Sequence, residues 1–398
     1  MAYDYNQIYS LLNAVSDEAF GGTAITVKDT DSLVSLGNQV FKSDEDLDAF
    51  YKALPVVIGR VITWYFKVTP QTRGIQVTPL TFGAILERIT VYKIARAEQN
   101  GSWLSTQPDP FSKAKDDTDI HVNLIAKIAG YEIDKIVYDK QLRPAFSNAE
   151  RMAAFVDLIF QDMYNGMQVG LNDTAALTEC TSIAQIANFG QVTQFRNLLT
   201  EYNTDHTPLT LDEARENEAF LKWAAKQIKR TLSMMTRRVS TLYNIEKAER
   251  EIQTEDLRIH MLGDFASDLA FYLNADTYHK EFVEITGYEE ISSWQGAGTD
   301  DSFDEVSKIF IENGEDIPET ELSGVICSIF HAERMGCMIR DIRTKSLYNP
   351  KGELTNYYHK ADIGYFILPD MPQVVFYLAE SDFVPESDED DGGDDGED

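Results

Sequence analysis

One capped, amphipathic segment constrains the fold more than any other part of the sequence. Ser147 and Glu150 have the S-x-x-E spacing of a capping box, in which each side chain satisfies a free backbone N–H group at a helix start. The apolar residues that follow stand at steps of three and four, so they form one continuous stripe on a helix. Gly166 and Gly170 offer places for this helix to end. The pattern predicts a helix over about 147–170, roughly 30 Å long.

A second capping box, formed by Thr210 and Glu213, predicts another long helix, or two helices, ending near Tyr243. One side of this segment is apolar and the other is basic. The basic side is unusual, because 35 Lys and Arg against 66 Asp and Glu give the chain a formal net charge of −31. Such a face could touch phosphates, but it is more often solvated or paired with acidic side chains of a neighbouring copy, and we favour the pairing. Its residues are Lys222, Lys226, Lys229, Arg230, Arg237 and Arg238.

The first half of the chain has strand signals before the capped helix. Residues 55–98 are rich in β-branched and aromatic side chains, and the 56–58 and 61–66 runs are the strongest. Residues 100–119 are rich in turn formers and carry two prolines. We therefore expect a long β-rich extension that ends in an irregular loop.

The C-terminal half also has strand signals. Residues 257–261 alternate as a strand does, and 264–274 resemble a helix. Residues 322–347 resemble a hairpin, and two further strands, 356–368 and 373–379, are joined by a turn from Pro369 to Pro372. Helices and hairpins come in separate runs, not in βαβ alternation, so we expect the α+β class.

The two ends of the chain look unlike its middle. Residues 1–50 have apolar residues that we judge too sparse for a core, which favours an extended arm; they lack the basic region of a secretory signal. Residues 381–398 contain ten acidic residues and no basic one. Such a segment cannot bury enough surface to offset its ordering entropy, so we expect a solvated, disordered tail.

Most catalytic patterns are missing from the sequence. It has no GxxxxGK[ST], GxGxxG, HExxH or GxSxG motif. Cys327, His331 and Cys337 stand close together but lack zinc-site spacing, so we expect reduced, buried thiols. No apolar run is long enough to cross a membrane. We therefore predict no catalytic residue, no cofactor, no metal and no membrane contact, and a building block instead of an enzyme.

The C-terminal stretch contains EDLRIHMLGDFASDLAFYLNADTYHKEF and, later, SLYNPKGELTNYYHKADIGYFILPDMPQVVFYLAE. It resembles the closing part of the major capsid proteins of tailed bacteriophages, which have the Hong Kong ninety-seven capsid fold, and is most similar to those of short-tailed phages. The aromatic-rich turn and strand of that family correspond to Asn349, Pro350, Lys351, Gly352, Asn356, Tyr357 and Tyr358. The order of arm, long β excursion and capped helix also fits.

The resemblance implies a division of the chain into parts with separate roles. They are an N-terminal arm (1–59), an extended β-rich loop (60–125), a peripheral domain with the spine helix (126–200), an axial domain (201–345), return strands of the peripheral domain (346–380) and the acidic tail (381–398). We name six candidate inter-subunit contacts: Trp64, Arg73, Lys226, Arg230, Asn349 and Gly352.

The resemblance also implies a function. It is that of a major capsid protein which assembles in the host cytoplasm into hexamers and pentamers, forming the icosahedral shell of a virion around packaged double-stranded DNA. Portal and scaffolding proteins would be partners, and the DNA would be enclosed without specific binding, as the charge of −31 also favours. The alternatives are a bacterial nanocompartment shell of the same fold, an acidic protein that mimics DNA, and a metal-dependent enzyme.

Overall fold

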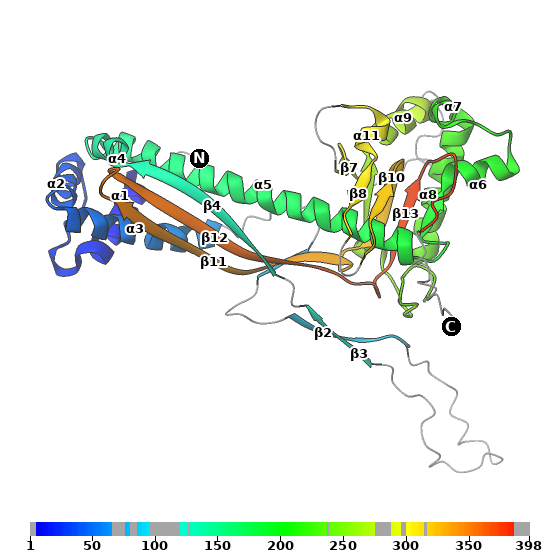
Figure 1. Cartoon of the computed structure of the whole chain (residues 1–398), viewed down its shortest axis with the longest axis horizontal. Coiled ribbons are helices and arrows are strands. Elements are labelled where there is room, and N and C mark those ends of the chain that lie inside the picture. The colour runs from blue at the N-terminus through cyan, green and yellow to red at the C-terminus, as the bar shows by residue number, and fades with distance from the viewer. Residues whose placement is uncertain are drawn as a thin grey trace, which may run out of the picture.

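The computed structural model describes residues 5–65, 76–79, 86–94, 120–125, 128–236, 239–274, 288–295, 300–313 and 317–385. The molecule is elongated, with one hydrophobic core at each end (Figure 1). The long helix α5 (Ala149–Phe189) and the long strands β11 (Met335–Asn349) and β12 (Leu354–Ile367) run between the two cores. Helices are combined with mainly antiparallel sheets, which confirms the α+β class.

The first core lies among the N-terminal helices. These are α1 (Tyr5–Phe20), α2 (Thr30–Val40) and α3 (Asp44–Tyr65), which pack with α4 (Asp139–Ala145) and the start of α5. Leu12, Leu33 and Phe50 are fully buried there. The prediction that residues 1–50 have too few apolar side chains for a core is therefore wrong, because their apolar residues gather on helix faces that share one interior.

Helix α3 also replaces the strand predicted at 56–66, at least as far as Tyr65. It starts after Ser43, whose Oγ accepts a 3.1 Å hydrogen bond from the backbone N–H of Asp46. A started helix adds one hydrogen bond per residue, whereas β-branched residues lower helix propensity by less than about 1 kcal/mol each. The local strand preference of 56–65 is therefore overridden.

A four-stranded sheet bridges the two ends, in the order β1–β11–β12–β4. β1 (Gln76–Pro79) is parallel to β11, and β4 (Ile128–Tyr138) is antiparallel to β12. One face of the sheet packs against α5, where Met167 and Leu171 meet Ala361 and Ile363.

Helix α5 begins later and ends much later than predicted. Its N-cap is Asn148, whose Oδ1 accepts from the N–H of Glu150, while the Ser147 hydroxyl bonds instead to the carbonyl of Pro144. The predicted capping box of Ser147 and Glu150 is therefore wrong, and the N-cap lies one residue after Ser147. Helix α5 continues through Gly166 instead of ending there. A Cβ at this position would stand 3.1 Å from Ile133 on β4, so the glycine permits a close approach of helix and sheet.

The second core contains a five-stranded sheet, in the order β5–β13–β10–β6–β7, covered by helices and by the last turns of α5. The predicted cap at Thr210 and the predicted helix at 264–274 are both confirmed, and the segment after Thr210 forms two helices. The strands are β5 (Phe195–Asn197), β6 (Leu257–Leu262), β7 (Tyr288–Ile291), β10 (Val325–His331) and β13 (Gln373–Tyr377). The helices are α6 (Leu198–Asp205), α7 (Leu211–Glu216), α8 (Glu218–Thr236), α9 (Gly263–Asn274) and α11 (Phe303–Val306).

The strands predicted within 322–347 exist, but they do not form a hairpin. β10 pairs with β6 and β13, whereas β11 pairs with β12 and β1, so the chain changes sheets at residues 332–334. It changes back between β12 and β13, and the predicted segment 346–380 is thereby divided between the two sheets.

Two small ribbons complete the described part of the chain. β8 (Ile309–Ile311) and β9 (Thr320–Leu322) pair at the edge of the second core. β2 (Leu86–Val91) and β3 (Ile120–Ile125) form a ribbon that leaves the body below the bridging sheet in Figure 1. Residues 100–119, where the loop tip was predicted, and most of the acidic tail lie outside the described residues.

Candidate functional site

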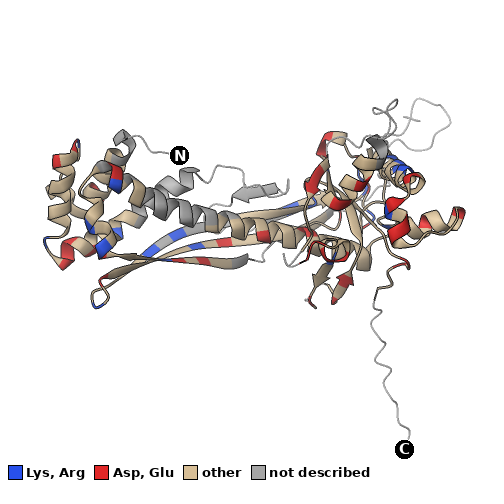
Figure 2. Cartoon of the chain, turned by 90° about the horizontal axis from the view of Figure 1, so that it is seen from above, with Lys and Arg blue, Asp and Glu red and all other residues tan. Residues whose placement is uncertain are grey.

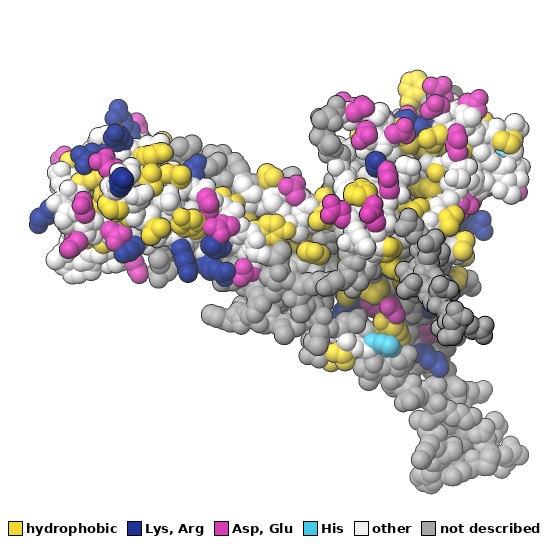
Figure 3. All heavy atoms as spheres, in the orientation of Figure 1, with side chains coloured by type: hydrophobic (Ala, Val, Ile, Leu, Met, Phe, Trp, Pro, Cys, Tyr) yellow, Lys and Arg dark blue, Asp and Glu magenta, His cyan; other side chains and the backbone are white. Residues whose placement is uncertain are grey.

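The ribbon of β2 and β3 is the first candidate contact surface. Ile89 stands opposite Val122 in the register, and Val91 lies two residues further along the same face. Ile89 is 65% exposed, Val122 52% and Val91 40%, and hydrophobic side chains are visible on this ribbon in Figure 3. On the opposite face, Arg88 pairs with Asp370 of the body. The ribbon thus turns its polar face inward and its apolar face outward, which is typical of a surface that has a partner.

Two of the six predicted contacts cannot be placed on this surface. Trp64 lies in the last turn of α3, in a stretch whose side chains are outside the described residues, and Arg73 is outside them altogether. Both therefore remain predictions.

Helix α8 carries the predicted basic face. Its apolar side is buried in the second core, where Phe220, Ala224 and Ile228 are fully inaccessible. Lys226 and Arg230 lie on the opposite, exposed side, one turn apart. Figure 2 shows acidic positions over much of the same end of the molecule, so this helix is a local exception to the charge around it.

The predicted turn at residues 349–352 joins β11 to β12, and it is confirmed as a tight turn. Asn349 Oδ1 accepts hydrogen bonds from the N–H groups of Lys351 (3.1 Å) and Gly352 (3.3 Å), and the carbonyl of Asn349 accepts from Gly352 as well (3.2 Å). A Cβ at Gly352 would stand 2.9 Å from Leu354 Cδ2. Asn349 and Gly352 are both exposed, but their first role is to shape this turn.

A buried carboxylate lies just behind the turn. Asp139 is 6% exposed, and it accepts hydrogen bonds from the hydroxyls of Tyr51 (2.6 Å) and Tyr348 (3.0 Å). Burial, and then the bond to Asp139, raises the pKa of Tyr51 strongly and that of Tyr348 to about 12. A nearby pocket of about 470 Å³ is lined by residues of both signs, including Lys140, Arg143, Asp139 and Glu353. This cluster could not be predicted from the sequence, because its members are far apart in the chain.

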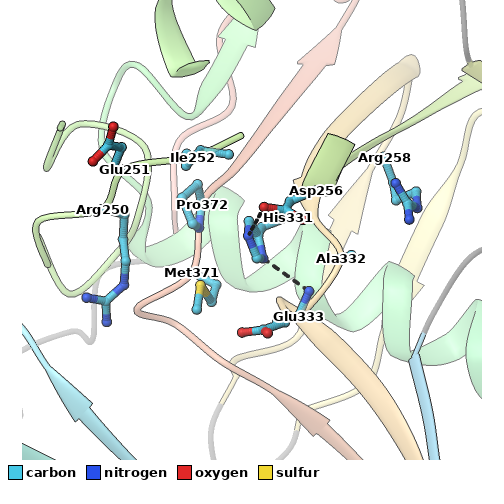
Figure 4. Close-up of a pocket in the computed structure, with 10 residues that line it drawn as sticks. All are labelled: Arg250, Glu251, Ile252, Asp256, Arg258, His331, Ala332, Glu333, Met371 and Pro372. Carbon is cyan, nitrogen blue, oxygen red and sulfur yellow. Dashed lines mark hydrogen bonds and ion pairs between the residues drawn. The ribbon is translucent and has the colours of Figure 1, made fainter. Parts of the chain in front are cut away.

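A second pocket, of about 570 Å³, lies where the chain changes sheets (Figure 4). His331 stands between Asp256 and Glu333: its Nε2 is 4.0 Å from Asp256 Oδ2, and its Nδ1 accepts from the N–H of Glu333 at 3.2 Å. Burial lowers the pKa of His331, although the two carboxylates oppose this shift. Arg250 and Arg258 also line the pocket, and each donates to groups of the chain itself. The pocket is therefore a polar junction lined by charged side chains of both signs.

Cys327 and Cys337 are fully buried, and they lie in different sheets. Burial raises the pKa of the Cys337 thiol to about 11. Within the described ranges, no three His, Cys, Asp or Glu side chains are placed to hold a metal ion. The described helices include none that is long and apolar enough to cross a bilayer.

Sequence reasoning missed the charged residues at the junction of the two cores. Arg334 and Asp370 are fully buried, and Arg250 is nearly so at 14% side-chain exposure. The only available signal was the turn from Pro369 to Pro372, which says nothing about charge pairing across the fold.

Three of the solved structures to which the chain is similar are bacteriophage capsids. The capsid of Staphylococcus phage Andhra has 10% sequence identity and a TM-score of 0.48, covering 75% of this chain and 81% of that one. The capsid of cyanophage P-SCSP1u has 11% identity and a TM-score of 0.45, covering 77% and 87%. The mature capsid of bacteriophage PhiM1 has 11% identity and a TM-score of 0.37, covering 79% and 88%. No curated protein sequence matches the chain.

The family model described as Phi29-like phage major capsid protein matches residues 12–377, which is nearly the whole chain. The chain therefore belongs to this family of phage major capsid proteins. It is a shell-forming protein of the virion, and it acts as an oligomer. The resemblance to the major capsid proteins of tailed phages is confirmed, and neither a nanocompartment shell nor a DNA mimic is favoured.

Proposed function

We propose that this protein works without catalytic turnover, as a tile whose hexamers and pentamers close into an icosahedral shell around double-stranded DNA. The observation that carries the proposal is the apolar outer face of the β2–β3 ribbon, with Ile89, Val91 and Val122 exposed. An isolated two-stranded ribbon is only marginally stable in water. Packing its apolar face on another surface would bury that face and stabilise the ribbon. In a shell, that surface belongs to a neighbouring copy.

The two cores take different places in this proposal. The part built on the bridging sheet and α5 is peripheral in the hexamer, and the part built on the five-stranded sheet is axial. Residues 1–59 would contact neighbours as a helical arm packed on its own core, and 60–125 would reach across as the extended loop. The elongated body supports this arrangement, because it presents long flanks to copies on either side (Figure 1).

Lys226 and Arg230 on α8, and the turn shaped by Asn349 and Gly352, are the proposed contacts outside the ribbon. Copies arranged in a ring meet head to tail, so a basic patch on one flank needs an acidic patch on the other. The exposure of Lys226 and Arg230 and the net charge of −31 support such a pairing.

Scaffolding and portal proteins are the proposed partners, with assembly in the host cytoplasm. The DNA would be enclosed without specific binding. The acidic composition supports this, because phosphate binding needs clustered Lys and Arg. A shell that repels its contents lets the packaged DNA move.

The test compares Ile89→Asp with Val192→Asp, which changes a 91% exposed valine outside the ribbon. Each variant is expressed with and without a co-expressed scaffolding protein, and particles are counted by negative-stain microscopy. We expect shells from the wild type and Val192→Asp, and mostly unassembled chains from Ile89→Asp. Normal shells from Ile89→Asp would contradict a role of the ribbon face in assembly.

A further inference from the structure

We propose that the carboxylate of Asp370 is a latch that fixes the ribbon to the junction between the two cores. Its Oδ1 pairs with Nη1 of Arg88, which lies on the ribbon (3.1 Å), and its Oδ2 with Nη2 of Arg250, which lies on the body (2.6 Å). The Asp370 side chain is completely buried, and both arginines are less than one-fifth exposed. One carboxylate thus joins two segments that share no sheet.

Backbone contacts add to the latch on the ribbon side. Arg250 Nη1 donates to the carbonyl of Val91 at 2.7 Å. The N–H of Glu249 donates to the carbonyl of Tyr92 at 2.8 Å, and Glu249 Oε2 accepts from the N–H of Ile94 at 3.0 Å. The end of β2 is therefore held by residues 249 and 250 together, so the ribbon is oriented as well as attached.

The body holds the same turn from its other side. Arg334 donates from Nη1 to the carbonyls of Leu368 (2.7 Å) and Met371 (2.9 Å), which flank Asp370. Its Nη2 donates to Gln185 Oε1 on α5 at 2.9 Å. A link thus runs from α5 through the turn at 368–371 to the ribbon. Any movement of that turn relative to α5 would be passed to the ribbon.

Arg88 contacts two carboxylates at once. While its Nη1 pairs with the buried Asp370, its Nη2 is 3.5 Å from Oε2 of Glu333, whose side chain is 56% exposed. Glu333 lines the pocket of Figure 4, so Arg88 also ties the ribbon to the segment where the chain changes sheets. Taken with the proposed shell function, on which this consequence rests, the latch sets the direction in which the apolar face meets a neighbour.

Hydrogen exchange on the full, unassembled chain tests the latch independently of shell formation. The reporting amides are those of Ile94 and Glu249. Each of them makes a hydrogen bond between the ribbon end and the body, so each is protected from exchange only while the ribbon is docked. Arg88→Met keeps most of the side-chain stem but removes the guanidinium that pairs with Asp370, while leaving the Arg250–Asp370 pair in place. Arg343→Met is the matched control, because it breaks an exposed arginine pair with Asp362 within the bridging sheet.

We expect Arg88→Met to speed exchange at both reporting amides by about tenfold or more. The amides of β10 and β13 should keep their wild-type rates, and Arg343→Met should match the wild type throughout. Asp370→Asn should speed exchange at the reporting amides even more. If Asp370→Asn unfolds the chain, the result for Arg88→Met is the test. Wild-type exchange at Ile94 and Glu249 in Arg88→Met would overturn the latch, whether or not the chain forms shells.

Discussion

The hydroxyl of Tyr51 on α3 donates a 2.6 Å hydrogen bond to the carboxylate of Asp139, the first residue of α4. The two residues are 88 positions apart, and both are buried. Because Tyr348 on β11 donates to the other oxygen of the same carboxylate, one group joins the N-terminal helices to the bridging sheet. The first core is therefore an integral part of the body.

Replacing Tyr51 with Phe should weaken this connection. The ring would remain, but a buried carboxylate would lose a donor, which costs about 1–3 kcal/mol of unfolding free energy. Urea unfolding followed by circular dichroism measures the change. Tyr365→Phe is the control, because Tyr365 is half-buried and its hydroxyl makes no hydrogen bond to the described residues; a change within about 0.5 kcal/mol is expected there. Equal stability of the Tyr51 variant and the wild type would show that the bond is not formed.

Alkaline pH should destabilise the protein through the same cluster. The pKa of Tyr348 rises to about 12 in the fold, from about 10 in an unfolded chain. Tyr348 therefore ionises at a lower pH in the unfolded state than in the folded state. Its contribution to the free energy of unfolding is fully present below about pH 10 and is lost as the pH rises toward 12. Urea midpoints at pH 8 and pH 11 should differ less in Tyr348→Phe than in the wild type. An identical pH dependence in both proteins would contradict this assignment.

Two glycines should respond to alanine in opposite directions. Gly324 has φ of +74°, and a Cβ there would stand 1.9 Å from the carbonyl oxygen of Leu378. Gly170 lies inside α5 with open space around it. We expect Gly324→Ala to lower thermal stability by about 2 kcal/mol or more, and Gly170→Ala to raise it by up to about 1 kcal/mol. Thermal melts compare the two, and a stabilising Gly324→Ala would contradict the backbone conformation described.

Reversing the charge of the α8 face should impair association. In Lys226→Glu/Arg230→Glu, the proposed contact with an acidic neighbour becomes repulsive, so assembly followed by light scattering should slow markedly. Added salt should slow the wild type but relieve the variant, because ions screen attraction and repulsion alike. Lys140→Glu/Lys345→Glu, which also reverses two exposed charges but lies outside α8 and outside the turn at 349–352, is the charge-matched control. Unchanged assembly in the double variant would show that the basic face is solvated and makes no contact with a neighbouring copy.

The elements that the sequence predicted well carry their signals locally. The cap formed by Thr210 and Glu213 exists, with reciprocal hydrogen bonds, because the four residues that form it are adjacent. The strand at 257–261 was readable from its alternation alone. In contrast, the second half of α3 was predicted as strand, since the helix depends on a start at Ser43 and on packing partners that the local composition does not reveal.

Pairing between distant segments was not readable from one sequence. β10 and β11 are adjacent in the chain and favour a hairpin interpretation, yet each finds its partners in a different sheet. The same holds for Asp370, because its two arginines are 120 and 282 positions away. Among the predicted contact residues, the exposure of Lys226, Arg230, Asn349 and Gly352 is visible in the structure, but their contact with another copy stays a prediction.

The most direct measurement is the size of what the chain forms. Analytical ultracentrifugation of the expressed protein, with a scaffolding protein present and absent, separates single chains of 45.0 kDa from rings and closed particles. We expect ring-sized species and shells, with negative-stain images of closed particles in the fastest fraction. A single 45.0 kDa species at every concentration, with scaffold and without, would contradict the conclusion that this protein acts by tiling with its own copies.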